Sequence, residues 1–183
     1  SAVGYRSLDW EGVLAATFGG RRLGGRYDFS RFHGTLYGFY HTDADHTWAA
    51  RLRATASFGE VPEQYRTALV SRGILRGFAL GDAPLVRHSV AGSLEYRFRI
   101  DTPPWFDELG LQDWWGAVFV DAGVGANSYE GLLRSSIYAD VGVTGRARVK
   151  YLGIPIYVWG SVAWPVSGRS GSPRVTLGLD WAF

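Results

Sequence analysis

Histidines are the first side chains to consider for acid–base or metal chemistry near neutral pH, and this chain has four of them: His33, His41, His46 and His88. Two of them, His41 and His46, flank the short segment TDAD, in which Asp43 and Asp45 add carboxylates. Such a group could bind a metal ion at the end of a hairpin. We favour the simpler interpretation of a solvated hairpin turn, and we predict no metal site.

A hydrolase would need a serine, a histidine and a carboxylate brought together at one place. His88 and Ser89 are adjacent in the sequence, but neighbours on a strand face opposite ways and cannot form a catalytic pair. The absence of cysteine removes both a disulfide framework and a thiolate metal site. We predict that the protein is not an enzyme and uses no cofactor.

The elements that position these residues follow one repeated pattern. Segments of roughly ten residues alternate apolar with polar side chains, and Gly, Asp, Ser and Pro separate them. In the first, Leu8, Trp10 and Leu14 share one parity, while Asp9 and Glu11 share the other. Across all the segments, the apolar parity holds no charged residue. About eight strands are expected, at 8–18, 31–41, 48–58, 90–100, 114–124, 137–150, 154–164 and 175–183.

Composition limits what such a sheet can be. The chain has 183 residues, which fits one domain at 1–183, and its net charge of +2 gives no broad field for binding nucleic acid. A soluble sandwich or a lipocalin-like barrel would also alternate in this way. However, aromatic residues lie at the ends of the apolar rows, and Gly and Ala are frequent within them, as in outer-membrane barrels. No run approaches the ~18 apolar residues of a membrane helix, so a membrane would be crossed by strands, which must form a closed barrel.

The chain ends on an aromatic residue within the last apolar row. Thr176, Gly178, Trp181 and Phe183 fit the pattern polar-x-Gly-x-x-aromatic-x-aromatic. This resembles the C-terminal strand signal by which outer-membrane barrels are recognised for assembly. Strand addition is its physical basis, because an exposed edge with regular parity can pair with another sheet.

A connection of some thirty residues lies between the third and fourth segments and contains Leu75, Arg76, Gly77 and Phe78. The next segment, LEYRFRI, carries Glu95, and the one after it contains Phe119, Asp121 and Gly123. This ordered set resembles the outer-membrane assembly and secretion superfamily typified by BamA, TamA and the two-partner secretion transporters (the bacterial surface antigen family). The order of three strands before the loop and five after it also fits, but it matches only the C-terminal half of the family's usual barrel.

The resemblance implies a transmembrane antiparallel β-barrel whose long loop enters the lumen. Arg76 at the loop tip would be desolvated there and would need carboxylates, for which Asp121 and Asp140 on neighbouring strands are the candidates. In the family, this contact holds the loop inside the barrel. We expect Phe78 to pack near Arg76, and we expect Glu95, Arg97 and Arg99 to belong to a lumen charge network.

The expected function is protein insertion or translocation in a bacterial-type outer membrane, by strand-edge templating of client outer-membrane or secreted proteins. The alternative is a minimal outer-membrane anchor or pore for a missing N-terminal passenger domain, without insertase activity. An eight-stranded barrel has an interior only wide enough for its own side chains and could not also hold the loop. We therefore expect half of a larger barrel, completed by a second copy or by a missing N-terminal half.

Overall fold

The fold is a single large antiparallel sheet. A computed structural model describes residues 6–21, 24–70, 73–101, 105–108, 110–151, 154–167 and 171–181. Eight strands lie in the order β1-β2-β3-β6-β7-β8-β9-β10, and each pairs with its neighbours in antiparallel fashion. Their bounds are β1 Ser7–Gly19, β2 Phe29–His41, β3 His46–Gly59, β6 His88–Ile100, β7 Leu111–Ala126, β8 Tyr138–Tyr151, β9 Ile154–Ser167 and β10 Arg174–Trp181. All eight predicted strands are present, so the all-β prediction is confirmed.

The two faces of the sheet are inverted relative to a soluble protein. The apolar parity faces solvent, with Leu14 on β1 90 % exposed and Leu177 on β10 78 % exposed. The polar parity includes the buried residues Thr55, Ser93 and Ser161, and Asp121 and Asp140 are fully buried. The predicted segregation of apolar and charged side chains to opposite faces is therefore confirmed, with charges on the more buried face.

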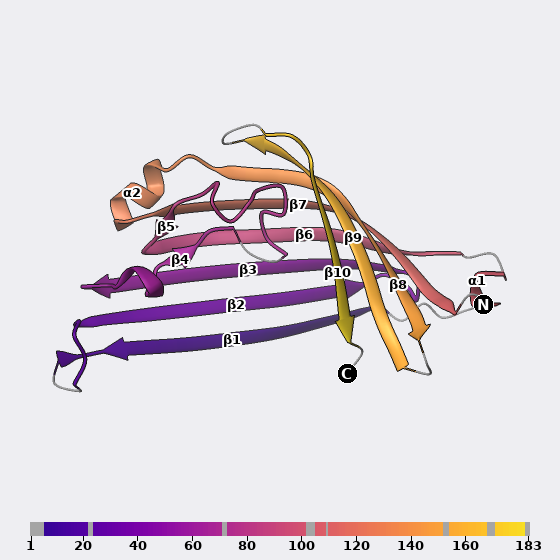
Figure 1. The fold of residues 1–183 in the computed structure, drawn as a ribbon, viewed down its shortest axis with the longest axis horizontal. Coiled ribbons are helices and arrows are strands. Elements are labelled where there is room, and N and C mark those ends of the chain that lie inside the picture. The colour runs from indigo at the N-terminus through magenta and orange to yellow at the C-terminus, as the bar shows by residue number, and fades with distance from the viewer. Residues whose placement is uncertain are drawn as a thin grey trace.

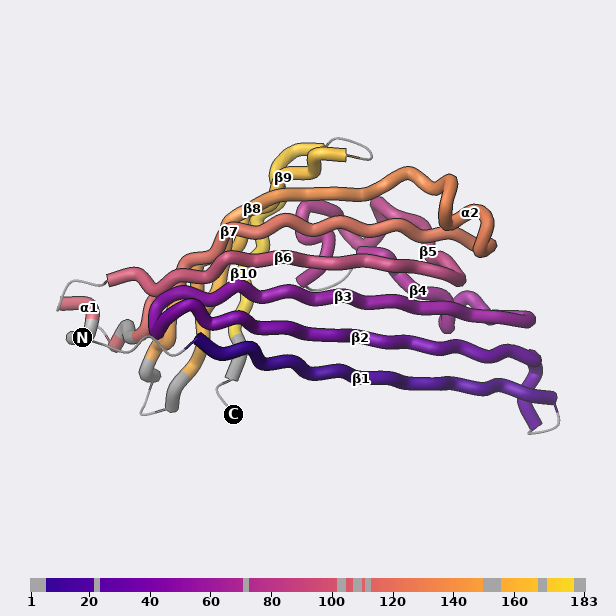
Figure 2. Tube along the Cα trace, turned by 180° about the vertical axis from the view of Figure 1, so that it is seen from behind, coloured from indigo at the N-terminus to yellow at the C-terminus, as the bar shows by residue number. Residues whose placement is uncertain are grey.

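The sheet is curled but open. Figure 1 shows β8, β9 and β10 bending across one face of the remaining strands, and Figure 2 shows the same curl from behind. We call the inner side of this curl the concave face and the outer side the convex face. In the described part of the chain β1 and β10 are the two edges of the sheet and do not pair with each other. The finer prediction of a closed barrel is thus not shown by this sheet.

The long connection at 60–87 lies on the concave face (Figure 1). It contains a 3₁₀ helix at Glu63–Tyr65 and a two-stranded ladder of β4 (Thr67–Ala68) and β5 (Leu85–Val86). The main hydrophobic cluster forms between this loop and the sheet, because the sheet's concave face supplies few apolar side chains of its own. It comprises Leu69, Val70, Ile74, Leu75, Phe78, Ala83 and Ala91, with Tyr138 packed against it.

Two other connections contain short helices that the strand pattern does not predict. The β6–β7 connection contains α1 (Trp105–Glu108), and the β7–β8 connection contains α2 (Tyr129–Arg134). The side chain of Ser128 caps α2 by accepting a hydrogen bond from the Gly131 amide. Both helices are a single turn or slightly more, too short for a periodic pattern to reveal them. Among the described residues, no helix has the length and apolar character that crossing a membrane would require.

Candidate functional site at the loop tip

The tip of the 60–87 loop is bound to the sheet through Arg76. Its guanidinium group donates from Nε to Oδ2 of Asp121 and from Nη2 to Oδ1, both at 2.9 Å. The Arg76 backbone amide also donates to Oδ2 of Asp121 at 3.3 Å. This two-pronged geometry is the strongest form of an arginine–carboxylate pair. The predicted contact between Arg76 and one of the two inward carboxylates is therefore present.

Other groups complete the surroundings of the guanidinium. Nη1 donates to Glu95 at 2.6 Å, Nη2 donates to the hydroxyl of Ser93 at 3.1 Å, and the group stacks 3.3 Å from the centroid of the Phe119 ring. Burial alone would lower the pKa of Arg76, but the hydrogen bonds and charges of Asp121, and then Glu95, outweigh it and hold that pKa above its usual value. Arg76 is thus a permanently charged anchor in a largely buried site.

The next residue of the loop contacts the second carboxylate. The Gly77 amide donates to Oδ2 of Asp140 at 3.0 Å. Asp121 and Asp140 are directly opposite each other on β7 and β8. Two adjacent like charges would repel, so each needs its own donor. The loop provides a donor for each of them, from Arg76 to Asp121 and from Gly77 to Asp140.

Small residues allow the tip to approach the sheet this closely. A Cβ at Gly77 would lie 2.8 Å from the Cβ of Asp140, and a Cβ at Gly123 would lie 2.9 Å from Ala91 and 3.2 Å from Leu75. Leu75 has a positive φ of 58°, an uncommon conformation for a residue with a side chain. Its side chain is fully buried, so packing of the tip holds the backbone in this conformation.

The two apolar residues of the motif, Leu75 and Phe78, belong to the loop cluster. The Phe78 ring packs edge-on against Tyr138 at a centroid distance of 5.4 Å. The aromatic ring that stacks on the Arg76 guanidinium is that of Phe119 on β7. The Phe78 carbonyl accepts a hydrogen bond from Nη1 of Arg174, which ties the tip to the C-terminal strand.

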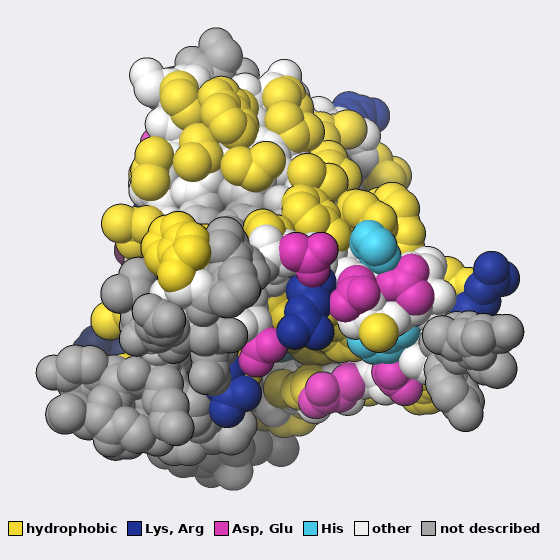
Figure 3. Space-filling model, turned by 90° about the vertical axis from the view of Figure 1, so that its right-hand side faces the viewer, with side chains coloured by type: hydrophobic (Ala, Val, Ile, Leu, Met, Phe, Trp, Pro, Cys, Tyr) yellow, Lys and Arg dark blue, Asp and Glu magenta, His cyan; other side chains and the backbone are white. Residues whose placement is uncertain are grey.

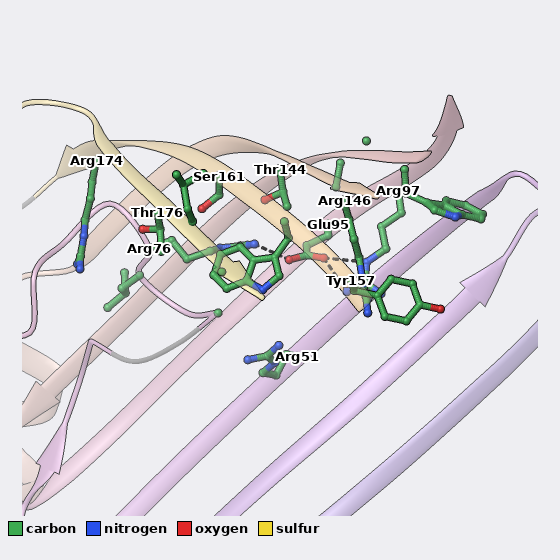
Figure 4. Close-up of a pocket in the computed structure, with 18 of the residues that line it drawn as sticks. Arg51, Arg76, Glu95, Arg97, Thr144, Arg146, Tyr157, Ser161, Arg174 and Thr176 are labelled. Carbon is green, nitrogen blue, oxygen red and sulfur yellow. Dashed lines mark hydrogen bonds and ion pairs between the residues drawn. The ribbon is translucent and has the colours of Figure 1, made fainter. Parts of the chain in front are cut away.

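A cavity of about 940 Å³ opens beside the tip (Figure 4). The loop, with Leu75, Arg76 and Phe78, forms one wall, and strands β2, β3 and β6–β10 form the rest. Glu95 lies on its wall, where it accepts from Nε of Arg97 at 2.8 Å as well as from Arg76. The expected network of Glu95 with neighbouring arginines is therefore present, although Arg99 pairs instead with Asp113, at 3.4 Å.

His41 lines this cavity, whereas His33, His46 and His88 are not among its lining residues. Figure 3 looks onto the end of the sheet with the β2–β3 turn, where acidic, basic and histidine side chains gather below a hydrophobic outer surface. His46 contacts Asp43 at 2.8 Å, whereas His41 contacts Thr47 at 2.8 Å. The two histidines thus form hydrogen bonds with different side chains. In the described part of the chain no group of three or more acidic or histidine side chains could hold a metal ion.

The C-terminal pattern is placed in part. Thr176 and Gly178 lie on β10 directly opposite Ser161 and Trp159 of β9, so they share the concave face with them. Trp181 is the last residue of β10, and Phe183 lies outside the described residues. The assembly role expected for these four residues stays a prediction.

Three contacts of the site are not evident from the sequence. Ser93, Phe119 and Arg174 all contact the tip, yet each is an ordinary member of an alternating strand. Their parity alone could have placed them on the same face as Asp121, because β6, β7 and β10 keep strict alternation around them.

Searches with protein-family models and against curated proteins find no match to this chain.

Proposed function

We propose that this chain forms part of an outer-membrane β-barrel whose convex face contacts lipid and whose concave face lines a lumen. The inverted sheet supports this most directly: large apolar side chains cover the exposed face, while Asp121 and Asp140 are fully buried on the other. Water would oppose such an arrangement, whereas hydrocarbon favours it. In the eight-stranded sheet, every strand but β10 has 13 or more residues, which exceeds the ~9–11 that a tilted transmembrane strand needs.

Within that barrel, the 60–87 loop is a plug held from the lumen side. A plug bound by one central ion pair, with an arginine-lined cavity beside it, is an arrangement suited to controlled passage of a large client. The resemblance of the Leu75–Phe78 tip and of the Phe119-x-Asp121-x-Gly123 strand to the outer-membrane assembly and secretion superfamily supports the same assignment. We therefore assign the protein to insertion or translocation of other proteins, without covalent chemistry.

The edges give this function a mechanism. Strands β1 and β10 expose backbone donors and acceptors that hydrocarbon cannot satisfy. Further strands must cover them in the membrane, either from a second copy of this chain or from an N-terminal half of the barrel. A weakly paired junction at β10 could then open and offer its edge to a client strand.

A second candidate function is that of a plain outer-membrane anchor or pore. The firm attachment of the tip favours it: Arg76, Gly77 and Phe78 all bind the sheet, so the plug has no evident release device.

Purified protein reconstituted into liposomes tests both candidates. An insertase should accelerate the folding of an added, urea-unfolded outer-membrane protein relative to empty liposomes of the same lipid. Cysteines at Leu14 and Leu179, joined by a reversible crosslinker, would lock the edges. Locking should abolish the acceleration, and release of the crosslinker should restore it. Membrane insertion without acceleration would support the anchor or pore, and failure to insert at all would refute both.

A further inference from the structure

Charges on the concave face are unevenly distributed. Five arginines line the cavity beside the loop tip: Arg51, Arg76, Arg97, Arg146 and Arg174. Among the described residues that line it, Glu95 is the one carboxylate. Other acidic side chains lie beneath the tip, as Asp121 does, or at the end of the sheet, as Asp45 and Asp113 do. The cavity wall therefore carries an excess of positive charge.

Arg146 has the most available of these guanidinium groups. It is exposed, and within the described residues it forms no ion pair. Its guanidinium stacks 4.0 Å from the centroid of the Tyr157 ring, which orients the group. No group in the described part of the chain accepts a hydrogen bond from its N–H donors. Figure 4 shows Arg146 and Arg97 on the same side of the cavity, near Glu95 and Tyr157.

Two tryptophans flank Arg146 across the sheet. Arg146 on β8 is directly opposite Trp115 on β7 and Trp159 on β9, so the three side chains share the concave face. Both tryptophans line the cavity. They place two natural fluorescent reporters next to the arginine.

We propose that this cavity is an anion-binding site, with Arg146 as its principal ligand and Arg97 and Arg174 as further sources of positive potential. Guanidinium groups bind carboxylate, phosphate and halide ions through their N–H donors, and a recessed wall of one charge raises the local concentration of counter-ions. If the chain lines a lumen, as proposed above, the passage beside the plug selects anions. That consequence rests on the proposed function, whereas the binding site itself does not.

Fluorescence quenching in detergent tests the site without a membrane. Iodide quenches exposed tryptophan and is an anion, while acrylamide does so without charge. The fluorescence of Trp115 and Trp159 is obtained by subtracting the fluorescence of the double variant Trp115→Phe/Trp159→Phe from that of the native protein. We expect Arg146→Gln to lower the iodide quenching constant of this component by about twofold or more and to leave the acrylamide constant unchanged. Arg146→Lys should retain most of the iodide quenching.

Arg148→Gln is the matched control. Arg148 lies two residues further along β8 on the same face, but it pairs with Asp113 at 3.6 Å and does not line the cavity. Its loss should leave both quenching constants unchanged. Equal iodide constants in native protein and Arg146→Gln, or an equal fall in Arg148→Gln, would overturn the proposal.

Reversal potentials in planar bilayers under a potassium chloride gradient then distinguish the proposed anion site from the proposed lumen. Anion-selective current that weakens in Arg146→Gln supports both the site and the lumen. Cation-selective current refutes the selectivity while leaving the barrel intact. Absence of current despite a positive quenching result refutes the pore but retains the site.

Discussion

Arg76 and Asp121 are 45 residues apart in the chain and form a buried, two-pronged ion pair, with both N–O distances at 2.9 Å. The side chain of Asp121 is fully buried and that of Arg76 is 12 % exposed. A buried pair of this kind adds little compared with an apolar contact, but removal of one partner leaves the other charged and unpaired. Loss of either Arg76 or Asp121 alone should therefore destabilise the attachment of the loop.

Replacement of Arg76 by alanine tests that attachment. We expect a loss of about 3–5 kcal/mol in the free energy of unfolding, because Asp121 would remain buried without its partner. Arg76→Lys should recover only part of this loss, since an ammonium group cannot bind both carboxylate oxygens in a fork. Urea unfolding of the refolded protein measures the energy, and limited proteolysis within 60–87 reports release of the loop.

Arg87→Ala is the control for this variant. Arg87 belongs to the same loop, but it is only partly buried and donates to the Gly59 carbonyl at 2.8 Å. Its loss should change the unfolding free energy by about 1 kcal/mol or less. Equal effects of the Arg76 and Arg87 substitutions would show that the central ion pair has no special role.

Gly77→Ala should also loosen the tip, for a steric reason. The added Cβ would lie 2.8 Å from the Cβ of Asp140, so the Gly77–Asp140 hydrogen bond would have to lengthen or break. We expect faster proteolysis of the loop and a stability loss of about 1–3 kcal/mol. Gly81→Ala, in the same loop, meets no atom within 4 Å and should leave both measurements unchanged. A Gly77 variant as stable as the Gly81 variant would contradict the close approach.

The convex face gives a direct test of a lipid environment. Leu52 is 50 % exposed and lies near the middle of β3, so Leu52→Arg should be nearly neutral in a water-soluble protein. In a bilayer we expect a loss of about 2–4 kcal/mol, measured by denaturant unfolding from lipid vesicles. Tyr40→Arg, on the same face near the end of β2, should cost only about 0–1 kcal/mol, because the headgroup region solvates charge. Equal costs at the two positions would argue against a spanning sheet.

Much of the sheet follows from the sequence because period-2 alternation is a local property. In β10, for example, the alternation alone predicts that the side chains of Val175, Leu177 and Leu179 point to one face of the sheet. The Arg76–Asp121 contact is expected on a different ground. The resemblance of the loop implies an arginine inside the barrel, and such a desolvated arginine needs a carboxylate, for which Asp121 and Asp140 are the candidates.

The remaining features depend on geometry that alternation does not encode. Which ring stacks on Arg76 depends on where the loop tip meets the sheet, and that ring is Phe119. The contact of Arg174 with the Phe78 carbonyl requires the sheet to curl until β10 reaches the loop. Sheet curvature arises from accumulated twist over many strands, and no single segment of sequence specifies it.

The last prediction concerns how the edges close. The sheet has an even number of antiparallel strands, so β1 and β10 run in opposite directions and could pair either with each other or with the corresponding edges of a second copy. The loop decides between these options, since its cluster of Leu69, Ile74, Leu75 and Phe78 already occupies part of the concave face. An eight-stranded barrel has room only for its own side chains, so closure within one chain would expel the loop and break the Arg76–Asp121 pair. A two-fold pair keeps both loops inside a wider barrel.

We therefore expect cysteines at the exposed positions Leu14 and Leu179 to be joined by a short bismaleimide between two chains, giving a covalent dimer in a denaturing gel. A monomer crosslinked within itself would overturn this expectation, and an inserted protein without any crosslink would instead indicate that other strands cover the two edges.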